Sequence, residues 1–243
     1  MTSFFLNDLP RVSLKTNTME SKSIKRRDRR SFLGALATGA TAIGLAPTIT
    51  SGGIKEGPNG QEGSQLDAWF GSIKGKHRMA FDAVTANDGF SVIWSYTFMN
   101  THNQMGTPDN DLTALIVLRN KAIVLAFEDK IWSKFKLGKM FKLVDYDTNA
   151  SAERNLYWSP KAGEMPEDGM SIKALMERGV RICVCETAIK MTTRMYAKAK
   201  GLDADEVKKE WIAGILPGIQ VVPSGVWAVN RAQESGCSYC AAG

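Results

Sequence analysis

The sequence predicts an α/β protein in three layers, a doubly wound, mostly parallel sheet of about five strands with helices on both faces. Leu112–Leu118 is an unbroken apolar run, typical of a strand that is buried on both faces of a parallel sheet. The β-branched run Val180–Val184 leads almost directly into good helix formers over Ala188–Ala199. Runs of these two kinds alternate from residue 76 to the end, and this alternation indicates βαβ units.

Residues 1–50 are predicted to be a targeting region, because they contain eight Lys or Arg against three acids and so carry five of the six net positive charges. A basic pair, an aromatic and a leucine stand in order ahead of the mild apolar run Gly34–Ala46. That run is shorter than the roughly 20 apolar residues of a membrane-spanning helix. The segment resembles a twin-arginine signal, whose matching residues are Arg29, Arg30, Phe32 and Leu33.

Such a signal implies export by the Tat translocon to the periplasm, where disulfides persist. Whether the signal is cleaved, and whether the chain starts at Met1 or Met19, stays open. Residues 51–243 have a net charge of only +1, which argues against nucleic-acid binding. Residues 51–70 are predicted to be a linker that ends in a short helix, Leu66–Phe70, because the stretch is rich in glycine and polar residues. Residues 71–243 then form one α/β domain.

The first half of the domain is expected to contain two strands and a buried helix. A strand is predicted over about 76–84, a helix over Phe90–Met105 and the central strand over Leu112–Leu118. The segments Ala122–Phe127 and Asp129–Phe141 are helical in pattern. The polar stretch Asp145–Gly169, rich in Asn, Ser, Pro and Gly, is predicted to be a long irregular excursion.

The second half repeats the alternation. Ser171 is expected to cap a short helix that ends before Gly179 and the strand Val180–Val184. After the helix Ala188–Ala199, Asp203 is expected to cap a further helix. The remaining predicted elements are the helix Ala204–Ala213, the strand Ile219–Val222, the helix Gly225–Glu234 and a last short strand, Cys237–Cys240.

The junction of Val180–Val184 with its helix is the candidate functional site. Ligands of α/β proteins bind at the carboxyl ends of the strands, and Cys185 stands at this end. A cysteine at a helix N-terminus is favoured as a thiolate, although a small buried core residue is the competing interpretation. On a strand, Cys183 would face the same way and lie deeper.

The other candidates follow from their places at strand ends. Arg119 and Asn120 follow the central strand, where an arginine could stabilise a thiolate or bind an anion, or simply be solvated. Glu186 adjoins Cys185, and the turn Ser224-Gly225 could offer backbone N–H groups to an anion. No Gly-rich phosphate loop supports nucleotide binding.

Cys237 and Cys240 are candidates for a disulfide or a labile redox pair, with Cys183 as a further redox candidate. A zinc site built from all four cysteines is the alternative, although a Cys-x-Cys spacing departs from the usual zinc knuckle. We otherwise expect no metal and no cofactor. A Cys–His pair with His77 or His102 could form only through folding.

From His77 to Tyr239 the chain resembles the DsrE/DsrF-like family of small α/β sulfur-relay proteins. The matching pieces are Leu112–Leu118 with the helix that follows it, the block Gly179–Cys185, and the ending Val221–Gly236 with its Pro-Ser-Gly helix start and Gln-Glu-Ser-Gly helix end. The resemblance implies that Cys185 carries sulfane sulfur as a persulfide, that the protein is a trimer or hexamer, and that a protein acts as sulfur donor or acceptor. A sulfurtransferase-like activity follows only if the cysteine is reactive.

A second hypothesis is a non-catalytic oligomeric subunit of the same fold that binds itself or a partner. The aromatic-rich segment Phe90–Met105 and Trp132 are its expected interface. Known sulfur-relay members lack an export signal, so the resemblance does not name the donor or the acceptor.

Overall fold

A computed structural model describes residues 60–243, with their side chains from Gly63 onward. The predicted targeting residues Arg29, Arg30, Phe32 and Leu33, together with most of the predicted linker, lie outside the described residues.

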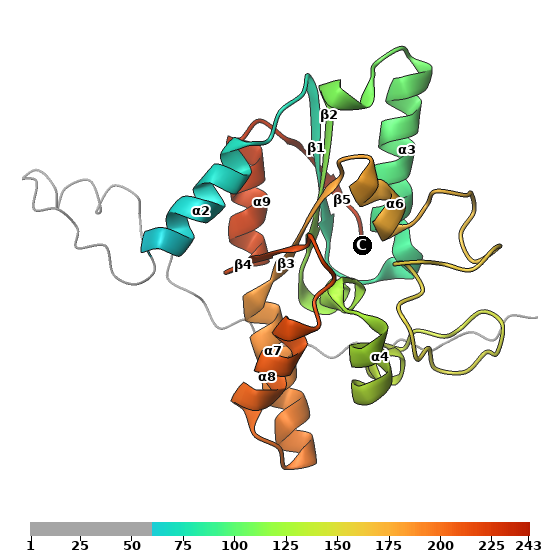
Figure 1. The fold of residues 1–243 in the computed structure, drawn as a ribbon, viewed down its shortest axis with the longest axis vertical. Coiled ribbons are helices and arrows are strands. Elements are labelled where there is room, and N and C mark those ends of the chain that lie inside the picture. The colour runs from blue at the N-terminus through green and yellow to red at the C-terminus, as the bar shows by residue number, and fades with distance from the viewer. Residues whose placement is uncertain (1–59) are drawn as a thin grey trace, which may run out of the picture. The chain divides into compact units, whose positions relative to one another are not determined.

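A five-stranded sheet, parallel throughout, forms the middle layer (Figure 1). The strand order is β4-β3-β2-β1-β5, so β2 and its two neighbours lie inside the sheet. Every residue of β2 is buried, as its apolar run predicts. The strands are β1 (His77–Ala83), β2 (Leu112–Leu118), β3 (Arg181–Cys185), β4 (Gln220–Val222) and β5 (Ser238–Ala241).

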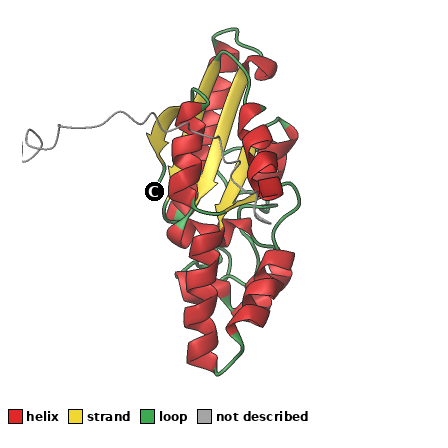
Figure 2. Ribbon diagram, turned by 90° about the vertical axis from the view of Figure 1, so that its left-hand side faces the viewer, coloured by secondary structure: helices red, strands yellow, loops and turns green. Residues whose placement is uncertain are grey.

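Helices cover both faces of the sheet, which confirms the predicted α/β architecture. On one face lie α2 (Gly60–Gly71) and α9 (Gly225–Glu234), and on the other lie α3 (Phe90–Gln104) and α6 (Ile172–Glu177) (Figure 1). Further helices extend past the carboxyl ends of the strands (Figure 2). These are α4 (Asp129–Phe135), α5 (Leu137–Phe141), α7 (Glu186–Lys200) and α8 (Ala204–Ala213), with short 3-10 turns η1 (Asn87–Gly89), η2 (Asp109–Asp111) and η3 (Asn120–Ala126).

Side chains alternate between two apolar cores, one on each face of the sheet. Ala80 of β1 and Leu115 of β2 belong to the core under α2 and α9, whereas Phe81 and Ile116 belong to the opposite core. The alternation decides which side chains can meet at the carboxyl edge. Cys183 lies in the core under α2 and α9.

The linker expected over residues 51–70 is helical from Gly60, six residues before the short helix expected at Leu66. Leu66 and Phe70 are four residues apart, so they fall on one face of α2 and are buried against the sheet. Arg181 of β3 lies over the Trp69 ring at 4.2 Å and donates to the Trp69 carbonyl oxygen at 2.8 Å. These contacts make α2 part of the domain.

The segment predicted as one helix over Asp129–Phe141 is instead two, α4 and α5. Lys136 between them is left-handed, with a φ of 52°. The break brings Gly138 against the backbone of Ala152, where a Cβ atom would lie 2.1 Å from the carbonyl oxygen. The preceding segment forms the 3-10 turn η3 rather than an α-helix. An apolar pattern does not reveal such a break, because both halves are buried.

The excursion expected over Asp145–Gly169 is irregular, and polar contacts tie it to the domain. The Asn155 side-chain amide donates to the carbonyl oxygens of Leu125 and Phe127, both at 2.9 Å. Within residues 60–243, no helix has the length and apolar character needed to cross a bilayer.

Candidate functional site

A hollow of about 300 Å³ opens at the carboxyl edge of the sheet, between the starts of α7 and α9. We call it the Cys185 hollow. The polar residues that line it come from the end of β2, the β3–α7 junction and the β4–α9 turn. They include Arg119, Asn120, Cys185, Thr187 and Ser224, with Gly225 beside them. All of these except Thr187 were singled out from the sequence, and they lie together because the carboxyl ends of parallel strands meet at one edge of the sheet.

Cys185 ends β3 and is the N-cap residue of α7. Its side chain is 6% exposed, and its Sγ accepts a hydrogen bond from the backbone N–H of Ala188 at 3.3 Å. First-turn N–H groups of a helix have no intrahelical acceptor, so a capping atom satisfies one of them. A thiolate or a persulfide on Cys185 would receive this N–H.

Cys183 lies two residues earlier on the same face of β3 and is fully buried. Burial raises the pKa of its thiol far above the usual range. Its place in the core under α2 and α9 fits the interpretation of a small core residue. Of this pair, only Cys185 lines the hollow.

Arg119 is held beside the hollow by a buried carboxylate that the sequence did not point to. Its Nε and Nη2 donate to Oδ1 and Oδ2 of Asp82, at 2.6 Å and 2.8 Å. Asp82 is in β1, on the same face as Cys183, and the Tyr239 hydroxyl of β5 donates to its Oδ2 at 2.9 Å. The hydrogen bonds with Asp82 raise the pKa of Arg119, and a charge interaction with Cys185 acts in the same direction.

The start of α9 is held by two contacts, one with α7 and one with Arg119. The N–H and hydroxyl of Thr187 both donate to the carbonyl oxygen of Pro223, at 3.2 Å and 2.7 Å. Gly225 packs so closely on Arg119 that an added Cβ would lie 2.6 Å from the arginine Cβ. Only glycine fits at this contact, which explains the Ser-Gly turn at the start of α9.

Glu186 does not join the site, although it adjoins Cys185 in sequence. Its carboxylate pairs with Lys208 of α8. It lines a separate hollow with Gln65, Leu66 and the residues of β4. Successive residues at a helix start point in different directions, so the two side chains diverge.

The C-terminal cysteines do not pair in the structure. Cys237 is buried in the core under α2 and α9, whereas Cys240 packs against the opposite core. Residues three apart in extended chain point to opposite faces, so the predicted disulfide would require β5 to rearrange. Burial raises the pKa of both thiols. All four cysteines are free in the structure, and Cys183 lies in the core under α2 and α9.

The zinc alternative and the Cys–His pair also fail on geometry. In residues 63–243 no three side chains of metal-ligating type gather into one group. His77 begins β1, at the amino edge of the sheet, and stacks on His102 with 4.4 Å between ring centres. Cys185 lies at the carboxyl edge, so neither histidine can act as its base.

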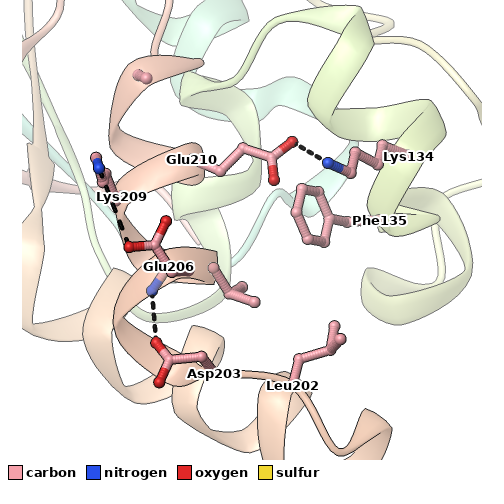
Figure 3. A pocket seen from close by; sticks show the side chains of 9 residues that line it. Lys134, Phe135, Leu202, Asp203, Glu206, Lys209 and Glu210 are labelled. Carbon is pink, nitrogen blue, oxygen red and sulfur yellow. Dashed lines mark hydrogen bonds and ion pairs between the residues drawn. The ribbon is translucent and has the colours of Figure 1, made fainter.

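A larger hollow of about 460 Å³ lies between α4 and α8, but it lacks a nucleophile (Figure 3). Its walls combine apolar Phe135 and Leu202 with charged residues of α8. The Lys134 Nζ, its most obvious reactive group, donates to Glu210 at 2.5 Å. The candidate site is therefore the Cys185 hollow.

No family model matches the chain, and no curated protein matches it. One solved structure is similar, that of a protein of unknown function from Methanobacterium thermoautotrophicum. It is 17% identical, and the match covers 68% of this chain and 98% of that one with a TM-score of 0.36. A likeness at this level carries no argument about function.

Proposed function

We propose that the protein carries sulfane sulfur as a persulfide on Cys185. The observation that carries the proposal is the position of this thiol. Cys185 caps α7 and lines a hollow at the carboxyl edge of the sheet, and Arg119 lines the same hollow. The hollow gives a small reagent access to a sulfur that bulk solvent barely reaches.

The chemistry needs no cofactor. The Cys185 thiolate attacks a sulfane sulfur of the donor, the donor's S–S bond breaks, and the electron pair leaves with the donor. The product, Cys–S–S⁻, keeps its negative charge on the outer sulfur. An acceptor nucleophile then takes that outer sulfur and regenerates the thiolate. Before the attack the negative charge of the thiolate lies on Sγ, to which the Ala188 N–H donates.

The resemblance to the DsrE/DsrF-like family supports this proposal, because sulfur-carrying members of that family have a cysteine in the corresponding place. It further suggests a homo-oligomer, trimer or hexamer, and a protein as sulfur donor or acceptor. Light scattering on the mature domain measures the oligomeric state. A monomer would remove that part of the proposal without affecting Cys185.

The alternative function, a non-catalytic oligomeric subunit, loses part of its expected interface. Trp132 is fully buried in the core of a single chain, so it is not available to a partner. Phe90 and Met105, at the ends of the aromatic-rich segment, remain exposed.

The experiment is intact-mass measurement after treatment with polysulfide. We expect one added sulfur, about 32 Da, on the wild-type protein and none on Cys185→Ser. Cys240→Ser is the matched control, because it removes a more exposed thiol outside the hollow and should keep the adduct. An adduct that survives in Cys185→Ser overturns the proposal.

We also propose export by the Tat pathway to the periplasm. The support is the order of Arg29, Arg30, Phe32 and Leu33 ahead of a mild apolar run. Export of a folded chain suits a protein whose proposed carrier cysteine lies in a hollow that forms only when several strand ends come together, as around Cys185.

A further inference from the structure

The lining of the Cys185 hollow is unusual in its charge. Beside apolar Met191, Met195 and Val226 it includes one cation, Arg119, an amide, three hydroxyl groups and the thiol, and no carboxylate. The hydroxyls of Thr187 and Thr192 already donate to backbone carbonyl oxygens, so the donors left for a ligand are those of Arg119, Asn120 and Ser224. The nearest acid in sequence, Glu186, is paired with Lys208 outside the hollow. The hydroxyl of Ser224 accepts no amide of α9 and donates to no group among the described residues, so it is free to donate to a ligand. Hydrogen-bond donors without a competing carboxylate suit an anion.

Arg119 is fixed in one orientation by the sheet beneath it. The Asp82 carboxylate accepts hydrogen bonds from Nε and Nη2 of Arg119. The Arg119 Nη1 has no partner among the described residues. Tyr239 donates to the same carboxylate from the other side, so Asp82 is itself anchored. Gly225 closes the contact by packing on the arginine stem. A guanidinium whose Nε and Nη2 are committed and whose Nη1 is free is prepared to bind an oxyanion.

We propose that the Cys185 hollow takes a small anionic sulfane donor ending in a sulfur oxyanion, of the thiosulfate type, and that Asp82 and Tyr239 position Arg119 to bind its oxygens. This inference rests on the persulfide function proposed above and names the substrate class of that site. The hollow, at about 300 Å³, has room for such an ion. A protein persulfide, the other source of sulfane sulfur, becomes an outcome of the test.

The step balances without an oxidant. The Cys185 thiolate attacks the outer sulfur of thiosulfate, whose S–S bond breaks. The bonding electron pair leaves with sulfite, and Cys–S–S⁻ remains on the protein. The SO₃ end of thiosulfate carries one negative charge and leaves as sulfite with two, and Arg119 stabilises the charge that develops there.

A pair of alkylating reagents tests the anion preference separately from sulfur chemistry. Iodoacetate is anionic and iodoacetamide is neutral, and both mark Cys185, which peptide mass spectrometry identifies. We expect the iodoacetate-to-iodoacetamide rate ratio at Cys185 to be about tenfold higher in the native protein than in urea, as loss of a charge-assisted hydrogen bond predicts. An equal ratio in both states overturns the inference.

Three variants assign the effect to the Arg119 arrangement. The double variant Asp82→Asn/Arg119→Gln removes both charges and so leaves no unpaired buried carboxylate. It should abolish the preference for iodoacetate. Tyr239→Phe keeps the arginine but loosens its anchor, and should lower the preference about threefold while the iodoacetamide rate stays the same. Lys121→Gln, the matched control, removes an exposed cation that does not line the hollow and should change nothing.

Thiosulfate and polysulfide complete the test with the full chain. The wild type should gain about 32 Da from either donor, and the double variant should lose the thiosulfate reaction at least tenfold more than the polysulfide reaction. Equal losses with both donors overturn the oxyanion inference and leave the persulfide function standing. No adduct from either donor, with the iodoacetate preference intact, overturns the persulfide function alone. An adduct formed only from a persulfidated protein replaces the small donor with a protein one.

Discussion

Two thiols separated by one residue in β3 have different surroundings. Cys183 packs among apolar side chains of the core, whereas Cys185 opens on a hollow that Arg119 and Asn120 also line. Desolvation penalises the charged form of a buried thiol, so Cys183 stays protonated in the folded protein. The difference arises from position along the strand and not from residue type.

The buried thiols should make the protein less stable at alkaline pH. Burial raises the pKa of Cys183 above its ordinary value of 9.0, so its contribution to the free energy of unfolding is complete below about pH 9. That contribution is lost as the pH rises towards the folded pKa, because the unfolded state ionises first. The expected loss is at most about 1.4 kcal/mol per pH unit for one thiol.

Urea unfolding at pH 7.5 and pH 10 measures this effect. Cys183→Ala should lose less stability between the two pH values than the wild type does. Burial also raises the pKa of Cys237, so the variant should still lose some stability between the two pH values. Identical losses in both proteins would mean that Cys183 ionises equally well in the folded state.

Gly225→Ala should damage the site through a steric clash. The new Cβ would lie 2.6 Å from the Cβ of Arg119, so the arginine or the start of α9 must move. We expect the free energy of unfolding to fall by about 1–3 kcal/mol, the usual effect of overpacking. Gly63→Ala in α2 is the control, since nothing lies within 4 Å of its added Cβ, and it should be neutral or stabilising. Equal stabilities of the two variants would contradict the close packing.

At the scale of elements, the site is built from two helix starts that differ in their caps. Cys185 caps α7 with its sulfur, whereas Ser224 makes no side-chain cap for α9. Thr187 joins the two starts through the Pro223 carbonyl oxygen. The uncapped turn of α9 leaves a hydroxyl and backbone N–H groups facing a region where an anion would be stabilised.

Ser171 and Ser224 both stand at the N-cap position of a helix, but only Ser171 makes a side-chain capping bond, so the two form a matched pair for stability measurements. The Ser171 side chain accepts from the Ala174 N–H at 3.0 Å, so Ser171→Ala should lower the free energy of unfolding by about 1 kcal/mol. Ser224→Ala removes no capping bond and should cost clearly less. Chemical denaturation of both variants checks the difference, and a Ser224 variant that is the less stable of the two would show that this hydroxyl has a structural role.

The sequence was most informative where one local pattern determines an element. Apolar runs located β2 and β3. Asp203 marked the start of α8, and its Oδ1 accepts hydrogen bonds from the backbone N–H groups of Asp205 and Glu206, both at 2.9 Å. Asp82 could not be predicted, because its meeting with Arg119 depends on strand register and on which face each residue takes. Glu186 was wrongly placed in the site, because successive residues at a helix start point in different directions and its carboxylate pairs with Lys208.

At the scale of the whole molecule, export should depend on the arginine pair. Arg29→Lys with Arg30→Lys should leave the domain folded but retain it in the cytoplasm, because an ammonium cannot replace the planar contacts of a guanidinium. Arg26→Lys with Arg27→Lys is the matched control and should be exported, since no Phe-Leu follows at the right distance. Cell fractionation decides, and full export of the first variant contradicts the Tat signal.

A sulfur carrier must release the sulfur that it accepts, and cyanide measures this release from Cys185 directly. Cyanide removes the outer sulfur of a persulfide as thiocyanate and leaves the thiolate behind. Protein loaded with polysulfide and freed of excess reagent should yield about one thiocyanate per chain and return to its original mass. Cys185→Ser should yield none, and Cys240→Ser should match the wild type. Thiocyanate from Cys185→Ser at the wild-type level would show that Cys185 does not carry the sulfur.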